Sequence, residues 1–248
     1  GSIRGAAARA SLVAAVKTMR NPKARRAVAK ALGDFRHDEE AAAALESLIK
    51  AGDESYFVEA EACLALGRTR SPRAKAALRM AIKRDSFADI VRQHAYRGLA
   101  EARDESALAL LIEGTRYGKV SQGRRAAILA LADLGCGRRD LAAREARERI
   151  EELLSDSDFR VQHTAIEGLA AHGDPQATPA LQRMIERELD GRLRRRGKEV
   201  IRDLGELRSQ GESLKVLHDD VERLRQEVAS LRDKLGHAEA KASRKTST

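Results

Sequence analysis

A leucine recurs at nearly constant intervals along most of this 248-residue chain. The successive separations are 34, 33, 35, 35 and 35 residues, at Leu32, Leu66, Leu99, Leu134, Leu169 and Leu204. A small or β-branched apolar residue stands four positions earlier each time, at Val28, Ala62, Ala95, Ala130, Ala165 and Val200. Residues four apart lie on one face of an α-helix, so each leucine marks an amphipathic helix. A period of this length predicts a repeat architecture.

Signals for helix ends divide each period into two helices. A side-chain acceptor precedes a proline at Asn21-Pro22, Ser71-Pro72 and Asp174-Pro175, which is typical of a helix N-terminus. Glycines close behind the leucines predict left-handed helix ends, at Gly33, Gly67, Gly135, Gly173 and Gly205. Each unit is therefore expected to hold a leucine-bearing helix and a second helix, each of about 11–15 residues.

The repeat length alone is shared by several helical repeat classes. The Trp, Tyr and Gly positions of tetratricopeptide repeats are missing, and so is the Thr-Pro-Leu-His run of ankyrin repeats. Alanines beside the leucines suit close helix stacking in short-period HEAT-like repeats. We predict an all-α, right-handed helical solenoid of about six HEAT-like repeats, over residues 3–208.

The beginning of the chain is an amphipathic helix without a polar outer cap. Gly1 and Ser2 look like a remnant of cloning and are left out of the fold prediction. Residues 6–19 resemble the second helix of a repeat whose first helix is missing. Because a solenoid normally begins with a polar terminal repeat, we expect the sequence to be the C-terminal piece of a longer protein.

The end of the chain carries heptads. Apolar residues step by three and four, at Leu214, Leu217, Val221, Leu224, Val228, Leu231 and Leu235. This pattern predicts a long helix with coiled-coil character over 209–240, followed by a disordered polar tail at 241–248. A parallel homodimer would pair opposite charges, at Asp220–Arg225, Glu227–Arg232 and Lys234–Glu239. The alternative is a helix that folds back on the last repeat.

No catalytic motif stands out. The zinc-peptidase H-E-x-x-H motif is missing, and His163 and Glu167 lie one helical turn apart without a further ligand. We expect no cofactor, no metal and no enzymatic activity. Cys63 and Cys136 are isolated and fit buried positions in a reducing cytoplasm. No apolar run is long enough to span a membrane.

The net charge is +9. Basic residues cluster most densely near the last repeat, at Arg192, Arg194, Arg195, Arg196, Lys198 and Arg202. For the doublets Arg25-Arg26 and Arg124-Arg125 we expect bonds to acidic side chains or helix-end carbonyls of the adjacent repeat. The alternative is a basic stripe that follows a phosphate backbone. The aromatic content of 3% weakens the case for single-stranded nucleic acid.

Several irregular turns resemble a known family. They are Gly52–Ala62 with Leu66–Thr69 and Ser71-Pro72, then Arg84–Phe87, Thr115–Gly118 and Asp158–Val161. These runs resemble the C-terminal HEAT-like domain of bacterial zinc aminopeptidases of the aminopeptidase N type, in the gluzincin family. The resemblance covers roughly residues 20–205. It implies a helical bowl that closes over the active site of an upstream catalytic domain, which holds the metal and the catalytic residues. The heptads depart from this pattern.

The sequence therefore favours a non-catalytic scaffold that binds a protein or peptide partner and self-associates through its last helix. The alternative is a nucleic-acid-binding solenoid, similar in architecture to the alkylpurine DNA glycosylases built from HEAT-like repeats. A metal-dependent enzyme that uses scattered histidines is a third, weaker hypothesis.

Overall fold

The computed structural model describes residues 5–245, without the side chains of 211–212, 214–216, 218–219 and 229–245. Residues 1–4 and 246–248 lie outside the described set, and with them Gly1, Ser2 and the end of the predicted tail. The described chain is helical and contains no strand. It divides into two units, Gly1–Arg202 and Asp203–Thr248.

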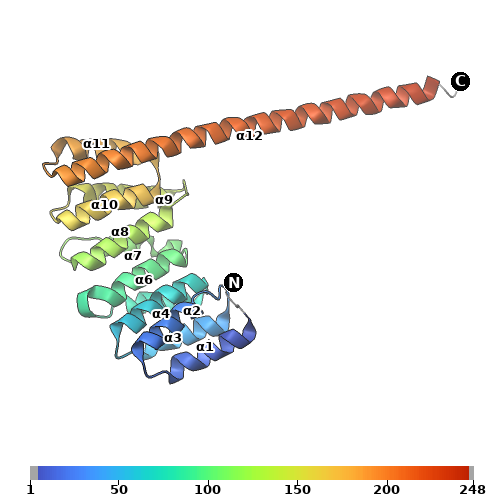
Figure 1. Ribbon diagram of the computed structural model, residues 1–248. Coiled ribbons are helices and arrows are strands. Elements are labelled where there is room, and N and C mark those ends of the chain that lie inside the picture. Colours follow the sequence, from blue (N-terminus) through green and yellow to red (C-terminus); the bar gives the residue numbers. More distant parts are fainter. Residues whose placement is uncertain (1–4, 246–248) are drawn as a thin grey trace. The chain divides into compact units, whose positions relative to one another are not determined.

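Helices of two kinds alternate along the first unit (Figure 1). The odd-numbered helices are α1 (Ala6–Thr18), α3 (Glu39–Ala51), α5 (Arg73–Ala81), α7 (Leu108–Gly114), α9 (Leu141–Glu152) and α11 (Thr178–Arg187). The even-numbered helices are α2 (Pro22–Leu32), α4 (Tyr56–Thr69), α6 (Ile90–Glu101), α8 (Ser121–Gly135), α10 (Phe159–His172) and the beginning of α12 (Gly191–Lys245). Short 3-10 turns are η1 (Phe87–Asp89), η2 (Glu105–Ala107), η3 (Leu153–Ser155) and η4 (Pro175–Ala177).

The two kinds of helix form two layers. Each even helix from α2 to α10 contacts the next even helix, and α1, α3 and α5 contact one another in turn. The predicted all-α solenoid is confirmed, with six helix pairs in the first unit. The second unit is the remainder of α12, which continues to Lys245 rather than ending at residue 240. The units divide after Arg202, six residues before the predicted boundary at 208.

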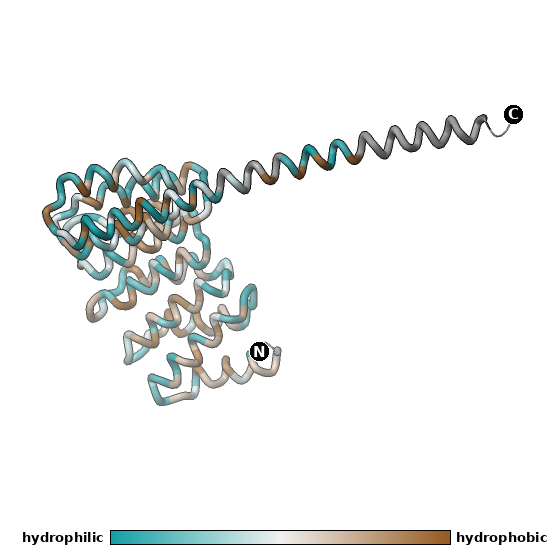
Figure 2. The backbone as a smooth tube through the Cα atoms, turned by 45° about the horizontal axis from the view of Figure 1, so that its top comes forward, coloured by the Kyte–Doolittle hydropathy of each residue, from teal (hydrophilic) through white to brown (hydrophobic). Residues whose placement is uncertain are grey.

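The recurring leucines form the centre of the stack. All six are at most 5% exposed, as are five of the six small or β-branched residues that precede them; Val28 is 8% exposed. Figure 2 shows apolar stretches recurring from helix to helix along the stack. Since one helix pair has no other surface on which to bury its apolar face, every even helix depends on its neighbours for burial.

The glycines behind the leucines mostly serve packing rather than capping. Gly173 ends α10 with a φ of 73°, as predicted. Gly33 is right-handed, however, and Gly67, Gly135 and Gly205 lie inside helices, so those four caps were predicted wrongly. A Cβ on Gly67 would overlap the carbonyl group of Gly98 in the next even helix. Glycine is therefore required at this position by the close approach of α4 to α6, not by a helix cap.

Other residues turn the chain from an even helix to the next odd helix. The positive φ angle falls on His37, Arg70 and Arg103, with Gly137 and Gly173 in the later turns. Arg70 is the C-cap of α4, with a φ of 54°. Non-glycine residues adopt this left-handed conformation at a modest cost, which explains why a glycine pattern does not locate these turns.

Replacing Gly67 with alanine tests the close approach of α4 and α6. Gly67→Ala is expected to lower the free energy of unfolding by about 1–3 kcal/mol or more, because overpacking forces the two helices apart. Urea unfolding followed by circular dichroism measures this change. Gly205→Ala is the matched control, since that helical glycine has open space around its Cβ position. Equal stability of the Gly67→Ala variant and the wild type would contradict the role assigned to this contact.

Candidate interaction surfaces

Arg25, in the first turns of α2, links two successive turns of the solenoid. Its Nη1 donates to the carbonyl oxygens of Met19 (2.9 Å) and Arg20 (2.8 Å), at the end of α1. Its Nε and Nη2 donate to both carboxylate oxygens of Asp53, in the next repeat (2.7 and 2.8 Å). Asp53 in turn accepts from the Ser55 N–H. Burial alone would raise the pKa of Asp53, but the Arg25 and Ser55 hydrogen bonds lower it below its ordinary value.

Arg124 repeats this arrangement at the beginning of α8. Its Nε donates to the carbonyl oxygen of Thr115 at the end of α7 (2.9 Å), and its other nitrogens bind Asp156. Asp156 accepts from the Asp158 N–H (2.9 Å), as Asp53 does from Ser55. The guanidinium therefore satisfies an otherwise open helix-end carbonyl and holds a carboxylate of the next odd-to-even turn.

The same helix-end contact recurs at other repeats. Arg92 donates to the Ile82 carbonyl (2.7 Å), and Gln162 donates to the Leu154 carbonyl (3.3 Å). Arg26 and Arg125, the second members of the doublets, bond to the next even helix, at Glu61 (3.1 Å) and Thr164 (3.0 Å). The predicted bonds to acidic side chains or helix-end carbonyls are confirmed for Arg25, Arg26 and Arg124, whereas Arg125 bonds to a hydroxyl group.

In the first turns of α4, Glu59 stands where α2 and α6 have arginine. An arginine from the next repeat, Arg84, makes the helix-end contact instead. Glu59 accepts from the Asp53 N–H (2.8 Å) and from Arg84 (3.0 Å). The second guanidinium nitrogen of Arg84 donates to the Lys50 carbonyl oxygen, at the end of α3 (3.1 Å). The carbonyl is thus capped by arginine here as well, but from the following repeat.

Arg124 offers a test of these links. Arg124→Met would leave the Asp156 carboxylate and the Thr115 carbonyl buried without their partner. We expect a loss of about 3–5 kcal/mol in the free energy of unfolding, measured by urea titration. Arg194→Met is the control: Arg194 is exposed and makes no ion pair with another described residue, so a change within about 0.5 kcal/mol is expected. Equal effects of the two substitutions would refute the link.

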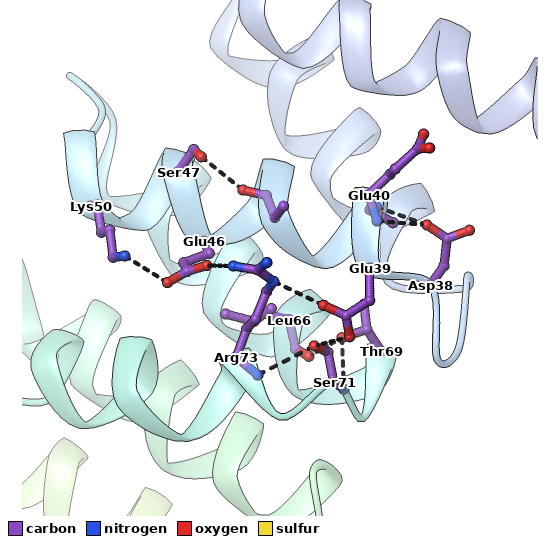
Figure 3. A network of polar contacts seen from close by, with 12 residues as sticks. Asp38, Glu39, Glu40, Glu46, Ser47, Lys50, Leu66, Thr69, Ser71 and Arg73 are labelled. Carbon is purple, nitrogen blue, oxygen red and sulfur yellow. Dashed lines mark hydrogen bonds and ion pairs between the residues drawn. The ribbon is translucent and has the colours of Figure 1, made fainter.

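A polar network joins α3 and α5 of the odd layer (Figure 3). Arg73 of α5 donates to Glu39 (2.9 Å) and Glu46 (3.0 Å), both in α3. Ser71 also donates to Glu39 (2.9 Å), and Lys50 pairs with Glu46 (2.6 Å). The hydrogen bonds from Arg73 and Ser71 lower the pKa of Glu39. The two odd helices are thus linked by pairs of opposite charge.

The predicted basic cluster is divided by the fold. Arg196 binds both carboxylate oxygens of Glu167 in α10 (2.7 and 2.9 Å), and Arg192 pairs with Asp190 while it covers the Phe159 ring. The Arg192 side chain lowers the pKa of Asp190 to about 2. The remaining members line an open hollow of about 530 Å³ on α12, at Arg194, Arg195, Lys198 and Arg202. Arg195 is paired there with Glu199 (3.0 Å).

A second open hollow lies between α9 and α11. Its volume is about 620 Å³, and most of its lining is charged. The charged side chains are Glu148, Glu151, Glu152, Glu188, Arg183 and Arg187. The lining thus carries both signs of charge, with glutamates on α9 and arginines on α11.

The histidines and cysteines in the described part of the chain do not gather into a metal site. No three His, Cys, Asp or Glu side chains gather there as a metal site requires. His163 lies 3.8 Å from Glu167, which is already bound by Arg196. Cys63 is buried as expected, and burial raises the pKa of its thiol to about 12. Cys136 is exposed because α8 ends just before it, so its predicted burial was wrong.

His172 is buried between α9 and the end of α8. Its Nε2 lies 3.0 Å from the Ala143 carbonyl oxygen, and its ring occupies the space that a Cβ on Gly135 would need. Burial lowers its pKa, and the hydrogen bond to Ala143 offsets part of that effect. Burial also lowers the pKa of His94 in α6.

These two histidines predict a pH dependence of stability. Below the ordinary histidine pKa of about 6.5, the unfolded chain binds more protons than the folded chain. The free energy of unfolding should therefore fall as the pH falls through 6.5 to the lower folded pKa values. The double substitution His94→Gln and His172→Gln should flatten this slope in urea titrations at several pH values, whereas exposed His37→Gln should not. An unchanged slope in the double variant would contradict the prediction.

The heptad positions on the second unit are partly described. Leu217, Val221, Leu224 and Val228 are exposed, between 37% and 60%. Leu207, one heptad before the first predicted position, is 48% exposed. The side chains of Leu214, Leu231 and Leu235 lie outside the described residues. Among the described residues, no helix is both long and apolar enough to cross a membrane.

Large apolar side chains are also exposed in the first unit, and sequence reasoning missed them. They gather where an odd helix passes into the next even helix, at Met19, Tyr56, Phe57, Phe87, Tyr117, Val120, Phe159 and Leu189. In the sequence their separations are irregular, and they resemble helix-start residues. The sequence signal that could have located the aromatic members is an aromatic residue that closely follows an aspartate of a predicted turn.

A family model for HEAT repeats matches residues 9–94, 50–132 and 121–202, which together span nearly all of the first unit. The chain belongs to the HEAT-repeat family. No curated protein matches this HEAT-repeat chain. The aminopeptidase resemblance stays a prediction, because the family model describes HEAT repeats in general.

Two solved structures resemble this HEAT-repeat protein in fold. One is the complex of CpcE and CpcF of phycocyanin lyase from Nostoc sp. PCC7120, with 18% identity and a TM-score of 0.51. That match covers 82% of this chain and 84% of the other. The second is a designed armadillo repeat protein in complex with the peptide (KR)4, with 15% identity, a TM-score of 0.50 and coverage of 78% and 98%. At these identities the likeness concerns the fold alone.

Proposed function

We propose that this protein is a non-catalytic scaffold, in which the HEAT solenoid binds a protein partner and the last helix joins two copies. The observation that carries the proposal is the apolar stripe on the second unit. Leu217, Val221, Leu224 and Val228 are spaced by four, three and four residues along a helix that has no other element of its unit to cover it. An exposed stripe of this kind marks an interaction site.

A second copy of the same helix fits the stripe. Valine at the first heptad position and leucine at the fourth favour two parallel strands. In such a pair, Asp220 of one copy meets Arg225 of the other. Within one chain, these residues pair with Arg223 (2.9 Å) and Glu222 (2.6 Å) on the same exposed helix. Exposed pairs contribute at most about 1 kcal/mol, so exchanging them across a dimer costs little.

The solenoid supports binding rather than catalysis. The buried Arg124 and the largely buried Arg25 are bonded to other repeats, and the described His, Cys, Asp and Glu side chains form no group that could hold a metal ion. Two neighbours in fold were solved in complexes, one with a partner subunit and one with the peptide (KR)4. By analogy, a protein or peptide is the partner class that we propose here.

The parent protein is a finer proposal. The runs that resemble aminopeptidase C-terminal domains include Arg84–Phe87, Thr115–Gly118 and Asp158–Val161, all of which lie at odd-to-even turns. If the chain follows an aminopeptidase-like catalytic domain, these turns are specific features of the C-terminal HEAT-like domain rather than positions common to all such repeats.

Nucleic-acid binding is a weaker candidate. The hollow lined by Arg194, Arg195 and Lys198 favours an anion. However, Glu199 lines the same hollow, and Arg192 and Arg196 of the cluster are bound to carboxylates. The charge available to a phosphate backbone is therefore smaller than the sequence suggests.

Charges placed in the stripe test self-association. The double substitution Leu217→Asp and Leu224→Asp should convert a dimer to a monomer in light scattering, because buried unpaired carboxylates are costly. Gln226→Asp is the matched control, since this exposed residue lies away from the stripe and should leave the dimer intact. A wild-type chain that is monomeric at micromolar concentration would refute the proposed assembly.

A further inference from the structure

One edge of the solenoid exposes apolar side chains at every repeat. Each of the six odd-to-even turns carries at least one, within the described residues of the first unit. The most exposed are Leu189 (95%), Tyr117 (82%) and Phe87 (77%). We call this row, from Met19 to Leu189, the turn edge. It holds five of the seven aromatic residues of the chain, since only Phe35 and Tyr96 are buried.

The opposite edge lacks such a row. At the even-to-odd turns, Leu141 is the exposed large apolar residue in the described part of the first unit. At one of these turns Arg73 forms an ion pair with Glu39 instead. Chance exposure would fall equally on both edges. Its concentration on one edge indicates an interaction surface.

The charges along the turn edge favour an acidic partner. Its aspartates Asp53 and Asp156 are bound by Arg25 and Arg124, so they are neutralised from within. Exposed cations of the same turns make no ion pair with another described residue, at Arg20, Lys23, Lys83, Arg160 and Arg187. The exposed acids of these turns without such a pair are fewer, at Glu54 and Glu186, and exposed Asp85 pairs with Arg92. This moderate excess of positive charge suits acidic side chains better than a continuous phosphate backbone.

The spacing of the row fits a helix. Stacked helices lie about 8–10 Å apart, so the exposed side chains of successive repeats recur at about that distance. A helix rises about 10.5 Å over seven residues, which returns a side chain to the same face. A helix along the turn edge can therefore offer one apolar side chain to each repeat. An extended β-strand would bring every third residue to that distance, on alternating faces.

We propose that the turn edge binds an acidic helical segment of a partner protein, which places one apolar residue per heptad against each repeat. This site is separate from the helix stripe that joins two copies. From the proposed scaffold function it takes only the assumption that the partner is a protein. Experiments can therefore contradict either site without contradicting the other.

The test uses a synthetic helical peptide of about four heptads with one leucine per heptad and otherwise glutamate and alanine. We expect salt-sensitive binding to the full chain in fluorescence anisotropy. Phe87→Ser with Tyr117→Ser should weaken binding about tenfold or more, because exposed aromatic anchors carry much of an interface. Leu141→Ser on the opposite edge is the matched control and should bind as the wild type does. Circular dichroism melting checks that each variant is folded.

Three outcomes would overturn the proposal. The first is equal binding of a peptide with lysine in place of glutamate, or no binding of the acidic peptide. The second is that the Phe87→Ser, Tyr117→Ser variant loses binding to oligothymidine, a single-stranded DNA probe, but still binds the peptide. The occupant of the turn edge would then be a nucleic acid. The third is a change in mass for that variant in light scattering, which would make a second copy the occupant. Unchanged peptide binding by the Leu217→Asp, Leu224→Asp variant would show that the turn edge acts independently of self-association.

Discussion

The stack depends on the close approach of one even helix to the next. A pair of helices of this size cannot bury its apolar face alone, so each leucine reaches zero or near-zero exposure only against neighbouring repeats. Small residues make that approach possible. Gly67 faces the Gly98 carbonyl directly, and the alanines four residues before the leucines are wholly buried. The short distance between successive even helices therefore explains why these helices are rich in alanine and glycine.

Arginine side chains then fix how one repeat sits on the next. Arg25 and Arg124 each join a helix-end carbonyl of their own repeat to an aspartate in the turn of the following one. Each of these ion pairs joins one positive and one negative charge, so the pairs leave the net charge of +9 unchanged. The surplus of basic side chains therefore lies outside these contacts.

Sequence periodicity located the leucine row, the helix pairs, several caps and the partners of the arginine doublets. Asn21, Asp38, Asp158 and Asp174 all cap helices with their side chains. Glycine positions were less informative, because glycine serves both left-handed turns and close helix contacts. The prediction for Cys136 was wrong because its exposure depends on where α8 ends, and the glycine before it did not reveal that position. The basic cluster was located by sequence, but its division into bound and open side chains required the positions of Glu167 and Asp190.

The sequence by itself determined the all-α repeat, its six-fold recurrence and the apolar heptads, because these depend on local spacing along one chain. Only the tertiary structure revealed that aromatic residues from separate repeats share one edge. Their spacing in sequence varies with turn length, so no simple period connects Phe87 to Tyr117 or Phe159. Stacking the even helices in parallel brings their first residues into one row, and burial elsewhere leaves that row exposed.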